Sequence, residues 1–290
     1  MGGYHAALEH GTAKALAAAL EGVCGELRGF AYEGAAMGLA LRDSLTPWPV
    51  NRLGEFLAGA GDAHTYMVHV GVGWVWARLA WSRRRIKGRL EPLLCWLAYD
   101  GWGFHEGFFH WREYLAGKAH PKRLAGYEKR AFDQGLGRSL WFVNGGNVEL
   151  IGRTLEEFAA ERHADVWSGL GLAATFAGVG TESRLAALRE QAGSWRPQLA
   201  QGAAFAAKAR QRAGNLTDYT DLATRTLCGL SAEDAARLCD TTLENLPGDG
   251  TQPAYEVWRQ RIQRAVAGTG PCGTGSESAL VQAAAVTVYP

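Results

Sequence analysis

Residues 132–142 read Phe-Asp-Gln-Gly-Leu-Gly-Arg-Ser-Leu-Trp-Phe, and this stretch contains the pattern that decides the fold. A polar residue precedes Gly135, a small residue follows two positions later, and a bulky residue normally comes next, although Arg138 takes that last place here. Five other segments share the pattern, with Val70 replacing the polar residue in one of them: Glu33–Met37, Val70–Trp74, Asp100–Phe104, Ser168–Leu172 and Gln201–Phe205. The six glycines at 34, 71, 101, 135, 169 and 202 are separated by 37, 30, 34, 34 and 33 residues. Such a period is typical of helix–turn–helix repeats, so we predict an all-α, α-solenoid-like array of about six Gly-marked hairpins.

The glycines themselves need a physical reason, because each costs about 1 kcal/mol relative to alanine inside a helix. Close approach of neighbouring backbones would offset this cost. We expect the Gly-marked helices to form an inner layer, and more ordinary amphipathic helices, such as 51–58, 154–160 and 182–192, to form an outer one. The alternative is an irregular bundle in which small residues recur by chance.

Helical periodicity dominates from about residue 4 to residue 268, and alternating strand patterns are sparse. The sequence therefore predicts a helical repeat domain over residues 1–268 and a Gly/Ser/Thr-rich C-terminal tail over 269–290. Two helix starts are predicted from capping chemistry, at Thr154 with Glu157 and at Ser231 with Asp234. Pro47–Pro49 and Gly178–Gly180 are expected to be connectors.

Composition limits the classes of function. Lys and Arg number 30 against 29 Asp and Glu, a net charge of +1 that gives no reason to expect nucleic acid as a partner. The five cysteines are scattered without CxxC spacing, which favours free thiols in a reducing cytoplasm. We find no secretory leader pattern and no apolar run of membrane-spanning length, so a cytoplasmic location is expected.

If the Gly-marked helices stack in register, the residues just before each glycine line one face. Aromatic side chains crowd the same helices and could build a deep apolar cavity. The predicted substrate-binding residues are Tyr32, Glu33, Trp74, Tyr99, Gln134, Arg138, Trp141, Asp165, Trp167 and Gln201. The alternative is that the polar ones only cap and hydrogen-bond neighbouring turns inside the array.

The densest cluster of titratable groups is the segment from Asp100 to His110. Its two histidines, His105 and His110, are five residues apart rather than the four of a zincin, but Glu106 and His110 form an i, i+4 pair. Together with His69 and Asp133 from neighbouring Gly-marked helices, they make a candidate metal set of His69, His105, Glu106, His110 and Asp133, a His/carboxylate combination typical of iron or zinc. The candidate catalytic residues are His69, Asp100, His105, Glu106 and Asp133. A satisfied buried His105 and a solvent-facing His110 are the competing interpretation.

The same motifs resemble a known bacterial family. The segments that carry the resemblance are Gly29–Gly34, Tyr66–Trp74, Asp100–Gly107, Phe132–Phe142, Asp165–Gly171 and Leu199–Ala206, of which Phe132–Phe142 is long and specific. They resemble the UnbL-like family, which is encoded beside enediyne polyketide synthases, and the resemblance runs from about residue 3 to about residue 265.

The resemblance implies a part in enediyne core formation, acting with the polyketide synthase cassette on a linear conjugated polyene. Two hypotheses follow. In the first, the protein is an enzyme that oxidatively remodels the polyene, with iron as a possible cofactor. In the second, it is a noncatalytic helical-repeat protein that binds the hydrophobic intermediate and docks pathway partners. A homodimer formed through one end of the array is a further expectation.

Overall fold

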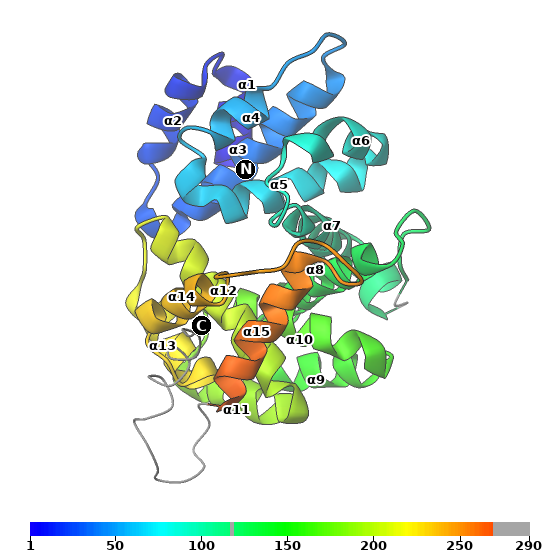
Figure 1. Cartoon of the computed structure of the whole chain (residues 1–290), viewed down its shortest axis with the longest axis vertical. Helices are drawn as coiled ribbons and strands as arrows, with labels where there is room; N and C mark the ends of the chain where they lie inside the picture. Colours follow the sequence, from blue (N-terminus) through cyan, green and yellow to red (C-terminus); the bar gives the residue numbers. More distant parts are fainter. Residues whose placement is uncertain (117–118, 269–290) are drawn as a thin grey trace, which may run out of the picture.

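The computed structural model describes residues 1–116 and 119–268, and it confirms an all-helical protein (Figure 1). No β-strand occurs in these two ranges. The C-terminal tail predicted for residues 269–290 lies outside the described residues. In the described part, no helix is both long enough and apolar enough to cross a membrane.

The helices fall into two sets. The longer ones that carry the predicted glycines are α3 (Gly25–Leu45), α5 (Thr65–Arg78), α7 (Trp96–Phe109), α8 (Tyr127–Val143), α10 (His163–Phe176) and α12 (Arg196–Arg212). The others are α1 (Gly2–Glu9), α2 (Ala13–Glu21), α4 (Arg52–Leu57), α6 (Arg83–Ile86), α9 (Val148–Glu156), α11 (Glu182–Ala192), α13 (Asp218–Cys228), α14 (Ala232–Thr241) and α15 (Ala254–Gly268). Short 3₁₀ turns and one π-helical segment, Arg112–Ala116, lie between them.

The Gly-marked helices pack against one another in chain order, α3 on α5, α5 on α7, α7 on α8, α8 on α10 and α10 on α12. Their glycines make the close approach possible. A Cβ added to Gly135 would lie 1.9 Å from the Asp100 carbonyl oxygen, and one added to Gly169 would lie 1.8 Å from that of Gln134. The same relation holds at the other interfaces: Gly71 faces the carbonyl of Glu33, Gly101 that of Val70, and Gly202 that of Ser168.

Each of these carbonyls belongs to the residue just before the glycine of the preceding helix, so one register recurs along the stack. A second set of glycines repeats it in the opposite direction. Gly73, Gly103, Gly137 and Gly171 each face a carbonyl of the following helix, three residues before that helix's own glycine. The structure therefore contains the backbone-to-backbone contacts that we predicted as the reason for the glycines.

The stack has one more member than the six glycines indicated. Gly3 of α1 would place a Cβ 1.9 Å from the carbonyl oxygen of Ala31, three residues before Gly34. This is the relation that Gly73 and Gly103 have to their neighbours. Helix α1 therefore packs on α3 in the same register, a point that its short sequence did not reveal.

Helix ends follow capping chemistry, with one correction. Ser231 caps α14 as predicted, its hydroxyl accepting the amide hydrogen of Asp234. The start predicted at Thr154 is wrong, because Thr154 lies inside α9 and donates to the carbonyl of Leu150. That helix is capped by Asn147 instead, whose Oδ1 accepts from the Leu150 amide at 3.1 Å. The local pattern was equally suited to a helix interior, where a threonine bonds back to residue i−4.

Helix α15 departs from the serial order. It lies across the stack at α12, as Figure 1 shows in orange, and its side chains also bond to residues of α8 and α10. The amino end of α3 meets the segment that follows α12 as well, because Asn215 donates to the Gly25 carbonyl at 2.8 Å. The row of helices is thus curved enough to bring early and late members together.

Candidate functional site

An aromatic cavity opens on the early half of the stack, between α1, α3, α5, α7 and α8. Its volume is about 260 Å³. The wall is mostly apolar, with two charged side chains among the rings. Its lining residues are Met1, Tyr4, Phe30, Glu33, Gly34, Met37, Trp74, Phe104, Phe108, Arg138 and Phe142. Three of the predicted substrate-binding residues, Glu33, Trp74 and Arg138, are therefore brought together here. We call this the aromatic cavity below.

The rings of the aromatic cavity are fixed by their contacts with each other. Phe104 is stacked on Phe108 with centroids 5.9 Å apart and meets Phe142 edge-on at 5.4 Å. Trp74 lies 5.7 Å from Phe104 and 5.6 Å from Phe109. Offset and edge-on arrangements of this kind are the favoured ones for aromatic pairs. They leave flat faces and edges available for a planar ligand.

Glu33 is a buried carboxyl group with a neutral hydrogen-bond donor. The indole Nε1 of Trp74 donates to its Oε1 at 3.0 Å. Burial raises the pKa of Glu33 above its ordinary value, while the positive charge of Arg138 and the bond from Trp74 oppose the rise without cancelling it. This carboxyl group is thus harder to ionise than that of an ordinary glutamate.

Arg138 links the aromatic cavity to a buried polar contact in the stack. Its Nη1 donates to Asp100, and Gln134 donates to the other oxygen of Asp100 at 2.7 Å. Burial disfavours the charged guanidinium, but the charges of Asp100 and Glu33 outweigh it, so the pKa of Arg138 is raised. The Nε of Arg138 is buried and has no hydrogen-bond partner.

His105, Glu106 and His110 lie together at the carboxyl end of α7, next to the aromatic cavity. His110 Nδ1 is 2.6 Å from one oxygen of Glu106, and His105 Nδ1 is 3.7 Å from the other. Burial alone would raise the pKa of Glu106, but the two neighbouring histidines outweigh it and lower the pKa. Trp74 connects this group to the cavity, because its ring meets the imidazole of His105 edge-on at 5.4 Å.

The structure does not gather all five predicted metal ligands. The group of potential ligands found within the described residues holds His105, Glu106 and His110 only. His69 Nδ1 lies 2.7 Å from the Thr65 carbonyl, and its Nε2 accepts from the Glu91 amide at 3.1 Å. Burial lowers the pKa of His69, so this imidazole is neutral and satisfied in its place.

Asp133 is likewise engaged elsewhere. Its carboxylate accepts bonds from Arg162 on both oxygens and lies 2.7 Å from His120 Nε2. It is buried, with only 2% of its surface exposed, so the paired arginine compensates a charge that water cannot reach. Asp133 therefore anchors the segment before α10 to α8.

The remaining predicted aromatic residues are core residues away from the aromatic cavity. Tyr32 stacks on His64 with centroids 4.0 Å apart, and Tyr99 donates to Glu128 at 2.7 Å. Trp141 and Trp167 are buried at 1% and 3% exposure, and neither lines the aromatic cavity. Their spacing in the sequence placed them correctly on the Gly-marked helices but not on the right side of them.

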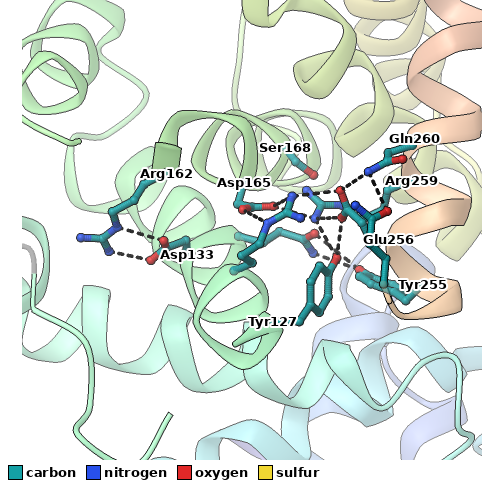
Figure 2. Close-up of polar contacts among 12 residues, drawn as sticks. Tyr127, Asp133, Arg162, Asp165, Ser168, Tyr255, Glu256, Arg259 and Gln260 are labelled. Atoms are coloured by element: carbon teal, nitrogen blue, oxygen red, sulfur yellow. Dashed lines mark hydrogen bonds and ion pairs between the residues drawn. The ribbon is translucent and has the colours of Figure 1, made fainter. Parts of the chain in front are cut away.

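Asp165 and Gln201 belong to a buried polar network that α15 completes. Arg259 donates to Asp165 at 2.7 Å and to Glu256, as Figure 2 shows. It also donates to Gln201. Arg130 of α8 pairs with both carboxylates, at 2.8 Å and 2.9 Å. Two carboxylates and two guanidinium groups balance in charge, and with Gln201 of α12 this network joins four helices, α8, α10, α12 and α15.

Several important residues were missed by the sequence argument. Phe30 and Tyr4 line the aromatic cavity but lie outside the rows counted from the glycines, and Met37 was missed although it follows Gly34 by three residues, as Trp74 follows Gly71. The partners Arg162 and Arg259 were missed too, since a paired arginine looks like any surface arginine in sequence. The i, i+3 spacing of Glu256 and Arg259 was the one local signal that could have indicated part of the network.

The fold and cavity define a class of all-helical proteins in which a stack of glycine-marked helices carries a small, ring-lined pocket. A family model described as "Protein of unknown function (DUF1702)" matches residues 1–266, and the chain belongs to this family. No curated protein and no solved structure matches the chain.

Proposed function

We propose that the protein acts in enediyne core formation, with a polyketide synthase cassette, by binding a linear conjugated polyene precursor in the aromatic cavity. The supporting observation is the cavity itself, a pocket of rings with a buried Glu33 and Arg138 in its wall. The resemblance of the Gly-marked segments to the UnbL-like family supplies the pathway. We further propose that the in-register stack is an α-solenoid repeat, whose curvature makes the pocket.

A conjugated polyene suits this pocket physically. It is flat and apolar, so its faces can lie against Phe104 and Phe142 while its edges meet Trp74. A volume of 260 Å³ is at the small end for ligand pockets, which suggests that it holds one end of the chain. The rest can continue over Phe108 and Phe109, whose side chains are 40% and 49% exposed at the cavity's edge.

The polar groups of the cavity wall, Glu33 and Arg138, suggest which end of the polyene enters the aromatic cavity. The positive charge of Arg138 in the cavity wall would attract a carboxylate or carbonyl oxygen at one end of the polyene. Glu33, whose pKa is raised by burial, would donate to the same end in its protonated form. One polar terminus on an otherwise apolar chain is what a polyketide synthase product carries when it is released as an acid.

The two hypotheses of enzyme and noncatalytic binder receive different support. Asp100 and Asp133 are neutralised by arginines, which favours a structural role for both and so favours the binding hypothesis at these positions. His105 and Glu106 are the predicted acid/base residues next to the aromatic cavity, so the oxidative hypothesis now depends on them. We propose polyene binding as the shared first step of both.

Polyene binding is testable with cis-parinaric acid, a conjugated tetraene acid whose fluorescence rises in apolar surroundings. The wild-type chain should bind it saturably, at one molecule per chain. Met37 is half-buried in the cavity wall, so Met37→Trp should fill the pocket and weaken binding at least about tenfold, a loss of about 1.4 kcal/mol. Met37→Leu conserves the volume and should bind as the wild type does.

Equal binding by Met37→Trp and Met37→Leu, with both variants folded by circular dichroism, would refute the aromatic cavity as the site. The pathway is tested separately in the producing cells. Loss of the gene should abolish the enediyne product, and Met37→Leu but not Met37→Trp should restore it. Undiminished product after loss of the gene would refute the pathway assignment.

A further inference from the structure

Three metal-ligating side chains converge where α7 ends, and we propose that His105, Glu106 and His110 bind a divalent first-row transition-metal ion. His105 and Glu106 are the last buried polar residues of α7, and His110 is the capping residue that leaves the helical conformation. Their potential ligand atoms all lie within 4.8 Å of one another. The inference is independent of the polyene proposal, since metal binding is measured without any organic ligand.

The distances are close to what a metal ion requires. Ligand bonds of about 2.1 Å in tetrahedral or octahedral geometry separate neighbouring donor atoms by about 3.0–3.4 Å. In the structure, the Nδ1–O separations are 3.7 Å for His105 and 2.6 Å for His110, one slightly long and one slightly short. The exposed imidazole of His110 can move outward and Glu106 can turn toward His105, which brings both separations into that range.

A second observation points to a missing ligand at this place. His105 is only 2% exposed, and its Nδ1 has no hydrogen-bond partner. A buried ring nitrogen is normally paired, so this one is an exception that needs an explanation. The Nδ1 atom lies on the side of the ring that faces Glu106. A metal ion between them would give it a partner.

The immediate surroundings also fit a metal centre. Trp102 Nε1 donates to Glu106 Oε1 at 3.2 Å, the kind of outer bond that orients a ligating carboxylate. The rings of Trp74 and Phe109 pack against His105 at 5.4 Å and 5.0 Å and shield it from water. Two imidazoles and one carboxylate leave coordination positions open, a donor set suited to Fe²⁺ or Zn²⁺.

Arg78 gives the proposal a specific and unusual consequence. Its Nε donates to His105 Nε2 at 3.0 Å. A guanidinium only donates, so Nε2 must be the accepting nitrogen, and neutral His105 then carries its proton on Nδ1. Metal binding through Nδ1 requires that proton to move to Nε2, where it would face the N–H of Arg78. Arg78 is solvent-exposed, so it can swing away, and metal binding must displace it.

Replacing Arg78 should therefore tighten metal binding. The side-chain amide introduced by Arg78→Gln would offer a carbonyl oxygen to an Nε2 proton and so favour the metal-binding tautomer. Outer partners of ligating histidines typically change metal affinity by about 10–100-fold, and we expect Arg78→Gln to increase it about tenfold. A role limited to hydrogen bonding among the three side chains gives no reason for such an increase.

The experiment uses the full chain stripped with a chelator and titrated with Co²⁺, Zn²⁺ and, without oxygen, Fe²⁺. We expect one ion per chain by equilibrium dialysis and elemental analysis, and visible absorption bands for Co²⁺. Glu106→Gln and His110→Gln should lower the affinity at least about tenfold, and His10→Gln serves as the matched control that should not change it. His110 is exposed, so its variant tests the site without disturbing the core.

Absence of binding by the wild-type chain, or binding that survives His110→Gln and Glu106→Gln, would overturn the proposal. Weaker binding by Arg78→Gln would overturn the assignment of His105 Nδ1 as the ligand atom. Circular dichroism on each variant separates loss of the site from loss of folding.

Discussion

Gly135→Ala is the sharpest test of the packing argument, because the variant adds one methyl group where two helices touch. Its Cβ would lie 1.9 Å from the Asp100 carbonyl oxygen and 2.6 Å from the Phe104 amide nitrogen. Both atoms are backbone, so no side chain can move aside. Helices α7 and α8 would have to separate by about 1 Å, which forfeits up to about half of the dispersion energy at their contact.

The magnitude follows from two opposing effects. Alanine gains about 1 kcal/mol over glycine in helix propensity. Overpacking of a close-packed core costs about 1–3 kcal/mol and occasionally more. The cost should be at the upper end here, since the separation also stretches the bonds from Gln134 and Arg138 to Asp100. We expect a net loss of about 2 kcal/mol, or a Tm lower by roughly 3–4 °C.

Urea denaturation followed by circular dichroism measures the change, with Gly25→Ala as the matched control. Gly25 begins α3 and has nothing within 4 Å of the added methyl group, so that variant should stay within about 0.5 kcal/mol of the wild type. A Gly135→Ala variant as stable as the wild type would show that these helices do not meet at backbone distance, and the explanation of the repeat would fail.

Three further predictions concern the buried charged residues Glu33, Arg138 and Arg259. Burial raises the pKa of Glu33 above 4.5, so the wild-type fold loses stability at this group as the pH rises above that value. Urea titrations should therefore find Glu33→Gln as stable as the wild type at pH 4 and more stable than the wild type at pH 7.5. Arg138→Met removes the counter-charge of Asp100 and should lower the free energy of unfolding by about 3–5 kcal/mol. Adding Asp100→Asn should recover part of that loss. A double variant no more stable than Arg138→Met would contradict the pairing. Arg259→Met should lower the free energy of unfolding by about 3–5 kcal/mol, measured by calorimetry or denaturation. The control Arg237→Met, at an exposed pair, should lower it by at most about 0.5 kcal/mol. Equal effects of the two variants would show that the buried network does not stabilise the fold.

The sequence predicted the close packing of the Gly-marked helices, because the requirement for glycine is local and recurs. A backbone carbonyl at each helix contact excludes any Cβ, so Gly71, Gly101, Gly135, Gly169 and Gly202 are forced by the same contact. The start predicted at Thr154 failed because threonine is equally at home in a helix interior when it bonds back to Leu150. The local pattern around Thr154 is compatible with both a helix start and a helix interior, so it cannot predict which of the two occurs.

The candidate site was predicted only in part, for a different physical reason. Spacing on one helix placed Glu106 and His110 together correctly. The fate of Asp133 depended instead on Arg162, which follows 29 residues later in the chain. Which arginine reaches which carboxylate is decided by tertiary packing, and no local signal reports it. The cavity residue Phe30 was missed for the same reason, since its position relative to Gly34 differs from that of the predicted row.

Two residues of the aromatic cavity occupy the same position relative to the glycines of their helices. Three residues after the glycine, α8 carries Arg138, which pairs with Asp100 just before the glycine of the preceding helix. At the equivalent place α5 carries Trp74, which bonds to Glu33 just before the glycine of α3.

The arrangement is the same in both cases, but the donor differs. A guanidinium neutralises its carboxylate and closes the contact, whereas an indole supplies one neutral N–H and a large apolar ring. Burial raises the pKa of the Glu33 carboxyl group beside it, and the ring forms part of the cavity wall rather than an ion pair. Arg138 and Trp74 both line the aromatic cavity, one with a charged group and the other with a ring. The candidate site thus combines two different hydrogen-bond donors at one position of the recurring pattern, a position that the other Gly-marked helices fill with Met37, Phe104, Leu172 and Phe205.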